Sequence, residues 1–208
     1  MITLFCDNKC ITVTYGKLEK ETCMAKKTLV WTKQNEGILN DLEENGRYIV
    51  KKEYIVKKME EHADVYLDVY DWFYKAASKL LKPPDDANYP IWVSLAQEEK
   101  IGNSDGNVQL EISIEPDDLL TMDIDKWGRI VNYMYIPKDK QDEAEHEHML
   151  ASYGVDDCTA YMTPFYPNIK QKIIKSWDRL FDETIVLSEF RVGIIWELKK
   201  EWIAEIVR

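Results

Sequence analysis

The strongest periodic signal in this chain is a stripe of apolar residues over residues 55–80. Successive members lie three or four residues apart, which is the spacing of one face of an α-helix. Charged residues fall between them, and Pro83-Pro84 ends the pattern because proline breaks a helix. We therefore expect one long amphipathic helix over about residues 52–81, packed by its stripe against another layer. The members of the stripe are Ile55, Met59, Ala63, Tyr66, Tyr70, Phe73, Ala77 and Leu80.

A second clear signal is the strict alternation of apolar and polar residues from Val108 to Ile114. Such alternation is typical of an antiparallel strand with one buried face. Residues 202–207 are expected to form a short closing element. Further strands are expected at residues 28–32, 48–50, 91–95 and 190–198, and further helices at residues 35–45, 125–134 and 168–181.

Strands and helices do not alternate strictly along the chain, which favours an α+β fold over a doubly wound parallel sheet. We expect a single domain with a mixed, mainly antiparallel sheet of about four or five strands and about four helices packed on it. The acidic stretch 137–147 has no apolar periodicity, so we expect a solvated surface helix or a loose loop there.

The composition argues against two classes of protein, those that bind a nucleic acid backbone and those that span a membrane. The chain has 208 residues, a length typical of one domain, and 38 acidic against 27 basic side chains give a formal net charge of -11. This excess argues against binding to a nucleic acid backbone, because that binding depends on clustered Lys and Arg. No apolar run approaches the roughly 18 residues of a membrane span. We therefore expect no binding to a nucleic acid backbone and no membrane partner.

The first 23 residues differ in composition from the rest of the chain. They carry no net charge, and three of the four cysteines (Cys6, Cys10 and Cys23) lie there, ahead of the first tryptophan, Trp31. We expect these cysteines to be reduced thiols, because zinc sites usually have closer pairs and a fourth ligand. The shift divides the chain into an N-terminal extension, residues 1–23, and one α+β domain, residues 24–208.

Two interpretations of the extension stay open. Glu19-Lys20-Glu21 is encoded by purine-rich codons, which fits a translated ribosome-binding site, with Met24 as the true start of translation. Alternatively, residues 11–15 alternate well and end at Gly16, which is the pattern of a β-hairpin.

Five segments of the chain resemble, in this order, segments of the bacterial family catalogued as domain of unknown function 3841. The resemblance covers about residue 28 to the end. It implies a shared fold unit, a bacterial, cytoplasmic protein, and little about chemistry. Family members start near the equivalent of Trp31, which favours Met24 as the start. The family tends to carry Gln ahead of the last segment, where this chain has Val192. The segments are Val30–Gln34, Tyr89–Trp92, Leu110–Trp127, Ser176–Asp182 and Ile195–Leu198.

The order of elements is also similar to the layout of ADP-ribosyltransferase-like domains, with a Trp-bearing first strand, a strand through Ser94 and a late strand with Glu197. The similarity implies nicotinamide adenine dinucleotide as cofactor and Glu197 as the carboxylate that orients the ribose hydroxyls. It makes Ser94 and Tyr89 pocket residues. Trp31-Thr32 stands where that superfamily carries His or Arg, which is a departure from the pattern.

The candidate site therefore has two catalytic residues, Glu197 and Ser94, and a set of ligand-binding residues. Aromatic side chains in a cleft can stack on a nucleobase or a nicotinamide. The alternative is packing in the core, which the apolar surroundings favour for Trp92, Trp127, Trp177 and Trp196. The candidate ligand-binding residues are Trp31, Thr32, Gln34, Tyr89 and Trp92.

Two groups of potential metal ligands have simpler explanations. His146 and His148 would diverge by about 200° on a helix, and a metal site needs about four ligands, so a solvated acidic helix is favoured. Four aspartates could hold Mg²⁺ or Ca²⁺, but each precedes an expected helix and fits an N-cap, so we expect no metal site. Cys158 has no His near it in sequence and is expected to be a surface or half-buried thiol. The aspartates are Asp117 and Asp118, ahead of a helix from Leu119, and Asp123 and Asp125, ahead of Trp127.

Three functions stay open at this point, and whether the protein is an enzyme is undecided. The first is an α+β domain that binds a small ligand or a protein and requires no cofactor. The second is an ADP-ribosyltransferase-like enzyme that uses nicotinamide adenine dinucleotide. The third is an acidic protein that engages a basic partner through residues 115–125 and 138–147, since acidic surfaces steer basic partners.

Overall fold

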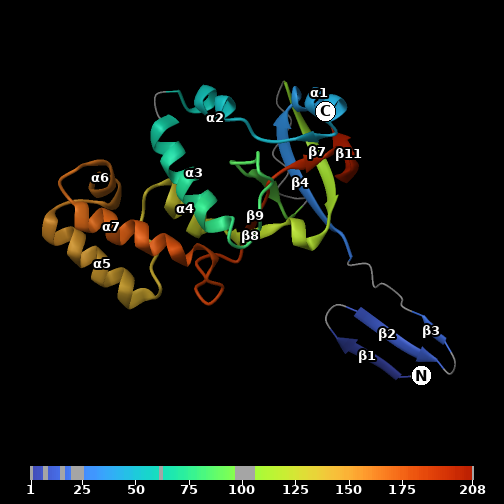
Figure 1. Cartoon of the computed structure of the whole chain (residues 1–208). Coiled ribbons are helices and arrows are strands. Elements are labelled where there is room, and N and C mark those ends of the chain that lie inside the picture. Colours follow the sequence, from blue (N-terminus) through green and yellow to red (C-terminus); the bar gives the residue numbers. More distant parts are fainter. Residues whose placement is uncertain are drawn as a thin grey trace.

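The computed structural model describes residues 2–6, 9–14, 17–19, 26–60, 63–96 and 106–207, and Figure 1 shows their arrangement. Its main element is a six-stranded sheet in the order β11-β7-β4-β6-β9-β8, with every neighbouring pair antiparallel. The strands are β4 (Thr28–Asn35), β6 (Ile91–Ser94), β7 (Asn107–Ile114), β8 (Leu120–Asp123), β9 (Arg191–Ile195) and β11 (Ile203–Val207).

Seven α-helices accompany this sheet in the described residues, which confirms the α+β class with more strands and helices than expected. A two-stranded ribbon joins β5 (Arg47–Tyr48) to β10 (Leu198–Lys199). In Figure 1, α3 to α7 gather on one side of the sheet and α1 lies on the other. The helices are α1 (Ile38–Asn45), α2 (Lys52–Met59), α3 (Ala63–Ala77), α4 (Ile124–Val131), α5 (Lys140–Tyr153), α6 (Asp157–Met162) and α7 (Pro167–Ser176).

The sheet separates two apolar cores, because successive side chains of a strand point to opposite faces. The strand predicted for residues 108–114 is confirmed, with Leu110 and Ile112 in the core that also holds Ile38 and Leu42 of α1; Gln109, on the other face, is buried as well. The other core lies under the remaining helices. It includes Phe73, Met122, Ile173, Trp177, Ile194 and Trp196.

The expectation of one helix over residues 52–81 is wrong. The chain leaves α2 at Glu60, whose φ is +48°, and resumes as α3 at Ala63. A positive φ is incompatible with a right-handed helix, so the stripe is divided between two helices. Leu80 lies beyond the end of α3 and is 59 % exposed.

The single strand expected over residues 190–198 is divided in the same way. β9 ends at Ile195, and the chain then pairs as β10 with β5. The closing element at residues 202–207 is confirmed as β11, which pairs with the edge of β7.

Of the predicted helix caps, Asp123 is confirmed and Asp117 is wrong. Pro116–Asp118 forms a short 3-10 turn, and the strand β8 follows where we expected a helix. Asp123 Oδ1 accepts hydrogen bonds from the backbone N–H groups of Asp125 and Lys126 at 2.9 and 3.2 Å. Burial by itself would raise the pKa of Asp123, but the backbone donors around it outweigh burial and lower the pKa.

The first strands of the chain form a separate antiparallel sheet, in the order β1 (Ile2–Cys6), β2 (Lys9–Thr14) and β3 (Lys17–Glu19). Residues 15–16 and 20–25, which include Met24, lie outside the described residues. The choice between Met1 and Met24 as the start stays a prediction.

Candidate functional site

Several of the predicted site residues lie on the neighbouring strands β4 and β6. Trp31 on β4 lies directly opposite Ser94 on β6, and its Nε1 donates to Glu111 at 2.9 Å. Thr32 is buried and donates its hydroxyl proton to the carbonyl oxygen of Trp92 at 2.8 Å. Side chains at Trp31 and Thr32 leave opposite faces of the sheet because strand residues alternate. The two therefore do not face one common site.

Tyr89 and Trp92 both approach Tyr70 of α3. The Trp92 Nε1 donates to the Tyr70 hydroxyl at 3.3 Å, and the rings of Tyr70 and Tyr89 lie edge to face at 6.0 Å. Trp92 also packs against Trp127 at 4.6 Å, inside the larger core. Tyr89 lines a cavity of about 330 Å³ beside α2 and α3. Gln34 points elsewhere, since its amide donates to the Thr32 hydroxyl.

Glu197 is held by two cations. Its carboxylate lies 3.0 Å from Arg47 and 3.4 Å from Lys199, and Arg47 also pairs with Asp86. It borders a different cavity, of about 280 Å³, that Trp196 and other aromatic and proline residues line. The structure thus places Glu197, Tyr89 and the Trp31–Ser94 pair in three different surroundings. The roles assigned to them stay predictions.

A third cavity, of about 530 Å³, is larger than these two and lies beside His146. Four segments form it: α4, the turn after it, α5, and the first residues of α6. We call it the His146 cavity. It is lined by Arg129, Asn132, Met134, Tyr135, Glu143, His146, Glu147, Leu150, Asp156, Asp157 and Cys158.

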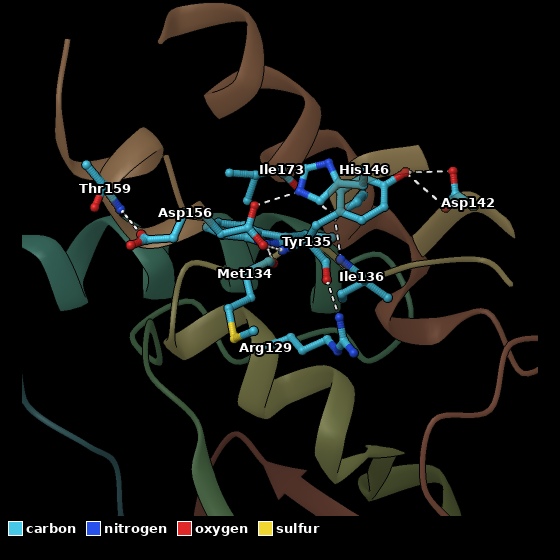
Figure 2. A network of polar contacts seen from close by, with 12 residues as sticks. Arg129, Met134, Tyr135, Ile136, Asp142, His146, Asp156, Thr159 and Ile173 are labelled. Atoms are coloured by element: carbon cyan, nitrogen blue, oxygen red, sulfur yellow. Dashed lines mark hydrogen bonds and ion pairs between the residues drawn. The ribbon is translucent and has the colours of Figure 1, made fainter. Parts of the chain in front are cut away.

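The imidazole of His146 is fixed from two directions (Figure 2). Its Nε2 lies 2.6 Å from Oδ1 of Asp157, and its ring stacks on Tyr135 with centroids 4.0 Å apart. The second oxygen of Asp157 accepts from the backbone N–H of Tyr135 at 3.0 Å. In a neutral imidazole, a carboxylate at Nε2 favours the tautomer that carries its proton there, which leaves Nδ1 as an acceptor.

Nδ1 of His146 is the one buried side-chain nitrogen or oxygen in the described part of the chain that lacks a hydrogen-bond partner. His146 is only 3 % exposed. An unsatisfied buried polar group is rare in native proteins and costs about 1–3 kcal/mol. The contacts with Asp157 and Tyr135 stabilise the fold through one nitrogen and the ring face, and they leave Nδ1 unused.

A second layer of contacts holds Tyr135. Its hydroxyl lies 2.9 Å from the carboxylate of Asp142, and Arg179 donates to both groups at 3.2 and 2.8 Å. Burial raises the pKa of Tyr135. Burial would also raise the pKa of Asp142, but the Lys138 N–H, the Tyr135 hydroxyl and Arg179 together lower it. Tyr135 therefore carries its proton and Asp142 its charge at neutral pH.

Arg129 and Asp156 complete the walls of the cavity. The guanidinium of Arg129 donates to the Tyr135 carbonyl at 3.0 Å and to Glu143 at 2.7 Å. Asp156 caps α6 by accepting from the N–H of Thr159 at 2.7 Å, and this hydrogen bond lowers the pKa of Asp156.

Comparison with known protein families identifies the family to which the chain belongs. Residues 29–204 match the family described as Domain of unknown function (DUF3841). The chain belongs to this family. Among curated proteins and among solved structures, no match was found for this DUF3841 protein. All residues of the His146 cavity lie within the matched range.

Two further findings describe this DUF3841 domain. None of the helices in its described residues is both long enough and apolar enough to cross a bilayer. Within the same described residues, no three His, Cys, Asp or Glu side chains are grouped so that they could hold a metal ion.

The sequence did not point to the His146 cavity. The acidic stretch 137–147 is predicted to be a solvated helix or a loop; its residues from Lys140 onwards do lie in α5, but His146 is buried. Neighbouring residues carried a usable signal, because Gly154 ends α5 with a φ of +62° and Asp156 begins α6 as its N-cap. These signals mark the end of α5 and the start of α6, but the contact between His146 and Asp157 depends on the angle between the two helices.

Proposed function

We propose that this DUF3841 domain binds a small molecule in the His146 cavity. Ligand sites in proteins are typically concave, roughly 300–1,000 Å³ in volume, and combine apolar walls with a few fixed polar groups. The His146 cavity has a volume of about 530 Å³ and joins the apolar Met134 and Leu150 to the polar His146 and Arg129. The observation that carries the proposal is the buried, incompletely bonded imidazole of His146 in its wall.

The rigidity of the cavity supports the same conclusion. His146, Asp157 and Tyr135 are linked by contacts of 2.6, 3.0 and 4.0 Å, and each belongs to a different segment of the fold. A wall fixed in this way loses little conformational entropy when a ligand binds, which favours affinity. The alternative, that the network serves only to join α5 to α6, leaves the unpartnered Nδ1 without a role.

A thermal-shift panel tests the proposal. It includes amines, carboxylates, nucleotides and nicotinamide adenine dinucleotide, measured on the wild type, on Cys158→Trp and on Ala151→Trp. Cys158 is exposed and lines the cavity, so a tryptophan there obstructs it, whereas Ala151 is an exposed residue of α5 that does not line it. A ligand at 100 times its dissociation constant stabilises a protein by about 2.7 kcal/mol.

We expect at least one compound to stabilise the wild type and Ala151→Trp but not Cys158→Trp. A panel in which every stabilising compound acts equally on Cys158→Trp contradicts the proposal. The dinucleotide arm also tests the roles predicted for Glu197, because a stabilisation that Glu197→Gln abolishes would support an ADP-ribosyltransferase-like site.

A further inference from the structure

We infer that the His146 cavity takes a small organic cation with an apolar body, an inference that rests on the cavity being the binding site. The carboxylates in its lining outnumber the cations. Among the described residues that line it, Arg129 is the only permanent cation. The same lining contains four carboxylates, those of Glu143, Glu147, Asp156 and Asp157.

The positive charge of Arg129 is already neutralised. Its guanidinium lies 2.7 Å from the carboxylate of Glu143 and also donates to the Tyr135 carbonyl at 3.0 Å. The carboxylate of Asp157 already contacts the imidazole of His146 through one oxygen and accepts a hydrogen bond from a backbone N–H through the other. An anionic ligand would therefore find no unpaired cation in this lining.

Two carboxylates at the cavity have no cationic partner among the described residues. Asp156 is exposed and bonds only to the first turn of α6, and those N–H donors keep it ionised by lowering its pKa. Glu147 is an exposed residue of α5. Fixed charges of one sign around a concave site concentrate the field there and raise the local concentration of counter-ions.

The apolar part of the ligand follows from the remaining walls. Met134 and Leu150 contribute apolar side chains to the lining, whereas the ring of Tyr135 is already covered by His146. A hydrated metal ion or a fully polar amine leaves these walls without a partner. A cation that carries an aromatic ring or an alkyl chain satisfies both the charge and the apolar walls.

Isothermal titration with three probes of one size tests the inference. Benzamidine is cationic, benzyl alcohol is neutral and benzoate is anionic, and all three carry the same ring. We expect benzamidine to bind most tightly, its affinity to fall as salt rises because salt screens exposed charges, and Cys158→Trp to abolish the binding.

A charge-removal variant makes the test specific. Asp156→Asn combined with Glu147→Gln removes both unpaired charges and keeps a capping side chain on α6, since Asn caps helices as well as Asp. Glu201→Gln combined with Glu205→Gln changes the net charge equally at exposed positions outside the cavity. We expect the first pair to weaken benzamidine binding roughly three- to tenfold and the control pair to leave it unchanged.

The outcomes separate this inference from the proposed function. If benzoate or benzyl alcohol binds more tightly than benzamidine and Cys158→Trp abolishes that binding, the cavity is a ligand site and the charge inference is wrong. If benzamidine binds equally to both double variants, the charge inference is also wrong. If no probe distinguishes the wild type from Cys158→Trp, neither claim survives for ligands of this size.

Discussion

His146 Nε2 lies 2.6 Å from Oδ1 of Asp157, and this contact joins the middle of α5 to the first residue of α6. Because the other oxygen of Asp157 accepts from the Tyr135 N–H, a single carboxylate ties three segments of the chain together. The same three side chains form part of the wall of the His146 cavity. A change at this carboxylate is therefore expected to alter both the stability of the fold and the wall of the cavity.

Replacing Asp157 by Ala should lower the free energy of unfolding by about 2–4 kcal/mol, because it leaves the Tyr135 N–H and the His146 ring without an acceptor. Urea denaturation measures the change. Asp156→Asn is the neighbouring control and should change stability by less than about 0.5 kcal/mol, since the cap is kept. A loss below about 0.5 kcal/mol in Asp157→Ala would show that the carboxylate does not hold these segments.

Gly193→Ala and Gly128→Ala should act in opposite directions. A Cβ on Gly193 would lie 2.8 Å from the side chains of Leu119 and Val93 in the sheet, so we expect a loss of about 1–3 kcal/mol. A Cβ on Gly128, inside α4, meets nothing within 4 Å, so the better helix propensity of Ala should add about 0.5–1 kcal/mol. Thermal unfolding of the two variants side by side provides the measurement, and equal shifts would contradict the packing described for β9.

Asp123→Ala should destabilise the domain by about 2–4 kcal/mol. The carboxylate caps α4, and its second oxygen accepts from the N–H groups of Leu187 and Ser188 at 2.8 Å each, so the loop before β9 loses its anchor as well. Hydrogen exchange should accelerate at Leu187 and Ser188. Unchanged exchange rates at both amides would show that Asp123 does not anchor this loop.

Stability should fall in acid. The pKa values of Asp123 and Asp142 are lowered in the folded state, so the unfolded chain binds protons more readily than the folded one. Their contribution is complete above the ordinary pKa of about 3.9 and is lost as the pH falls towards the lower folded pKa values. Denaturation from pH 7 to pH 2 should show this decline, with a shallower slope in Asp123→Asn. If the free energy of unfolding falls with the same slope in that variant, groups other than Asp123 cause the acid sensitivity.

The sequence predicted those parts of the fold that depend on local pattern. The alternation at Val108–Ile114 identified a central strand, and the apolar surroundings of Trp177 and Trp196 placed both in the core, where they are 1 % and 3 % exposed. Both features follow from side-chain period and hydrophobic burial, which are readable in one segment at a time.

The parts that the sequence missed depend on tertiary contacts. Nothing in the periodicity of residues 55–80 marks the positive φ at Glu60 that separates α2 from α3. The burial of His146 depends on Tyr135 and Asp157, which lie in other segments, so no pattern within α5 contains it. The order of strands predicted a catalytic role for Glu197, but its ion pair with Arg47 depends on the tertiary structure and leaves no pattern in the sequence.

The central claim, that the His146 cavity binds small molecules, is tested most directly by nuclear magnetic resonance of the protein with ¹³C-labelled histidine. The chain has three histidines, and His146→Gln assigns the resonance of His146. A fragment library with cationic, neutral and anionic members is added to the wild type and to Cys158→Trp. We predict fragments that shift the His146 resonance, leave His148 in place and lose their effect in Cys158→Trp. Fragments that bind and leave the His146 resonance unmoved would contradict the claim.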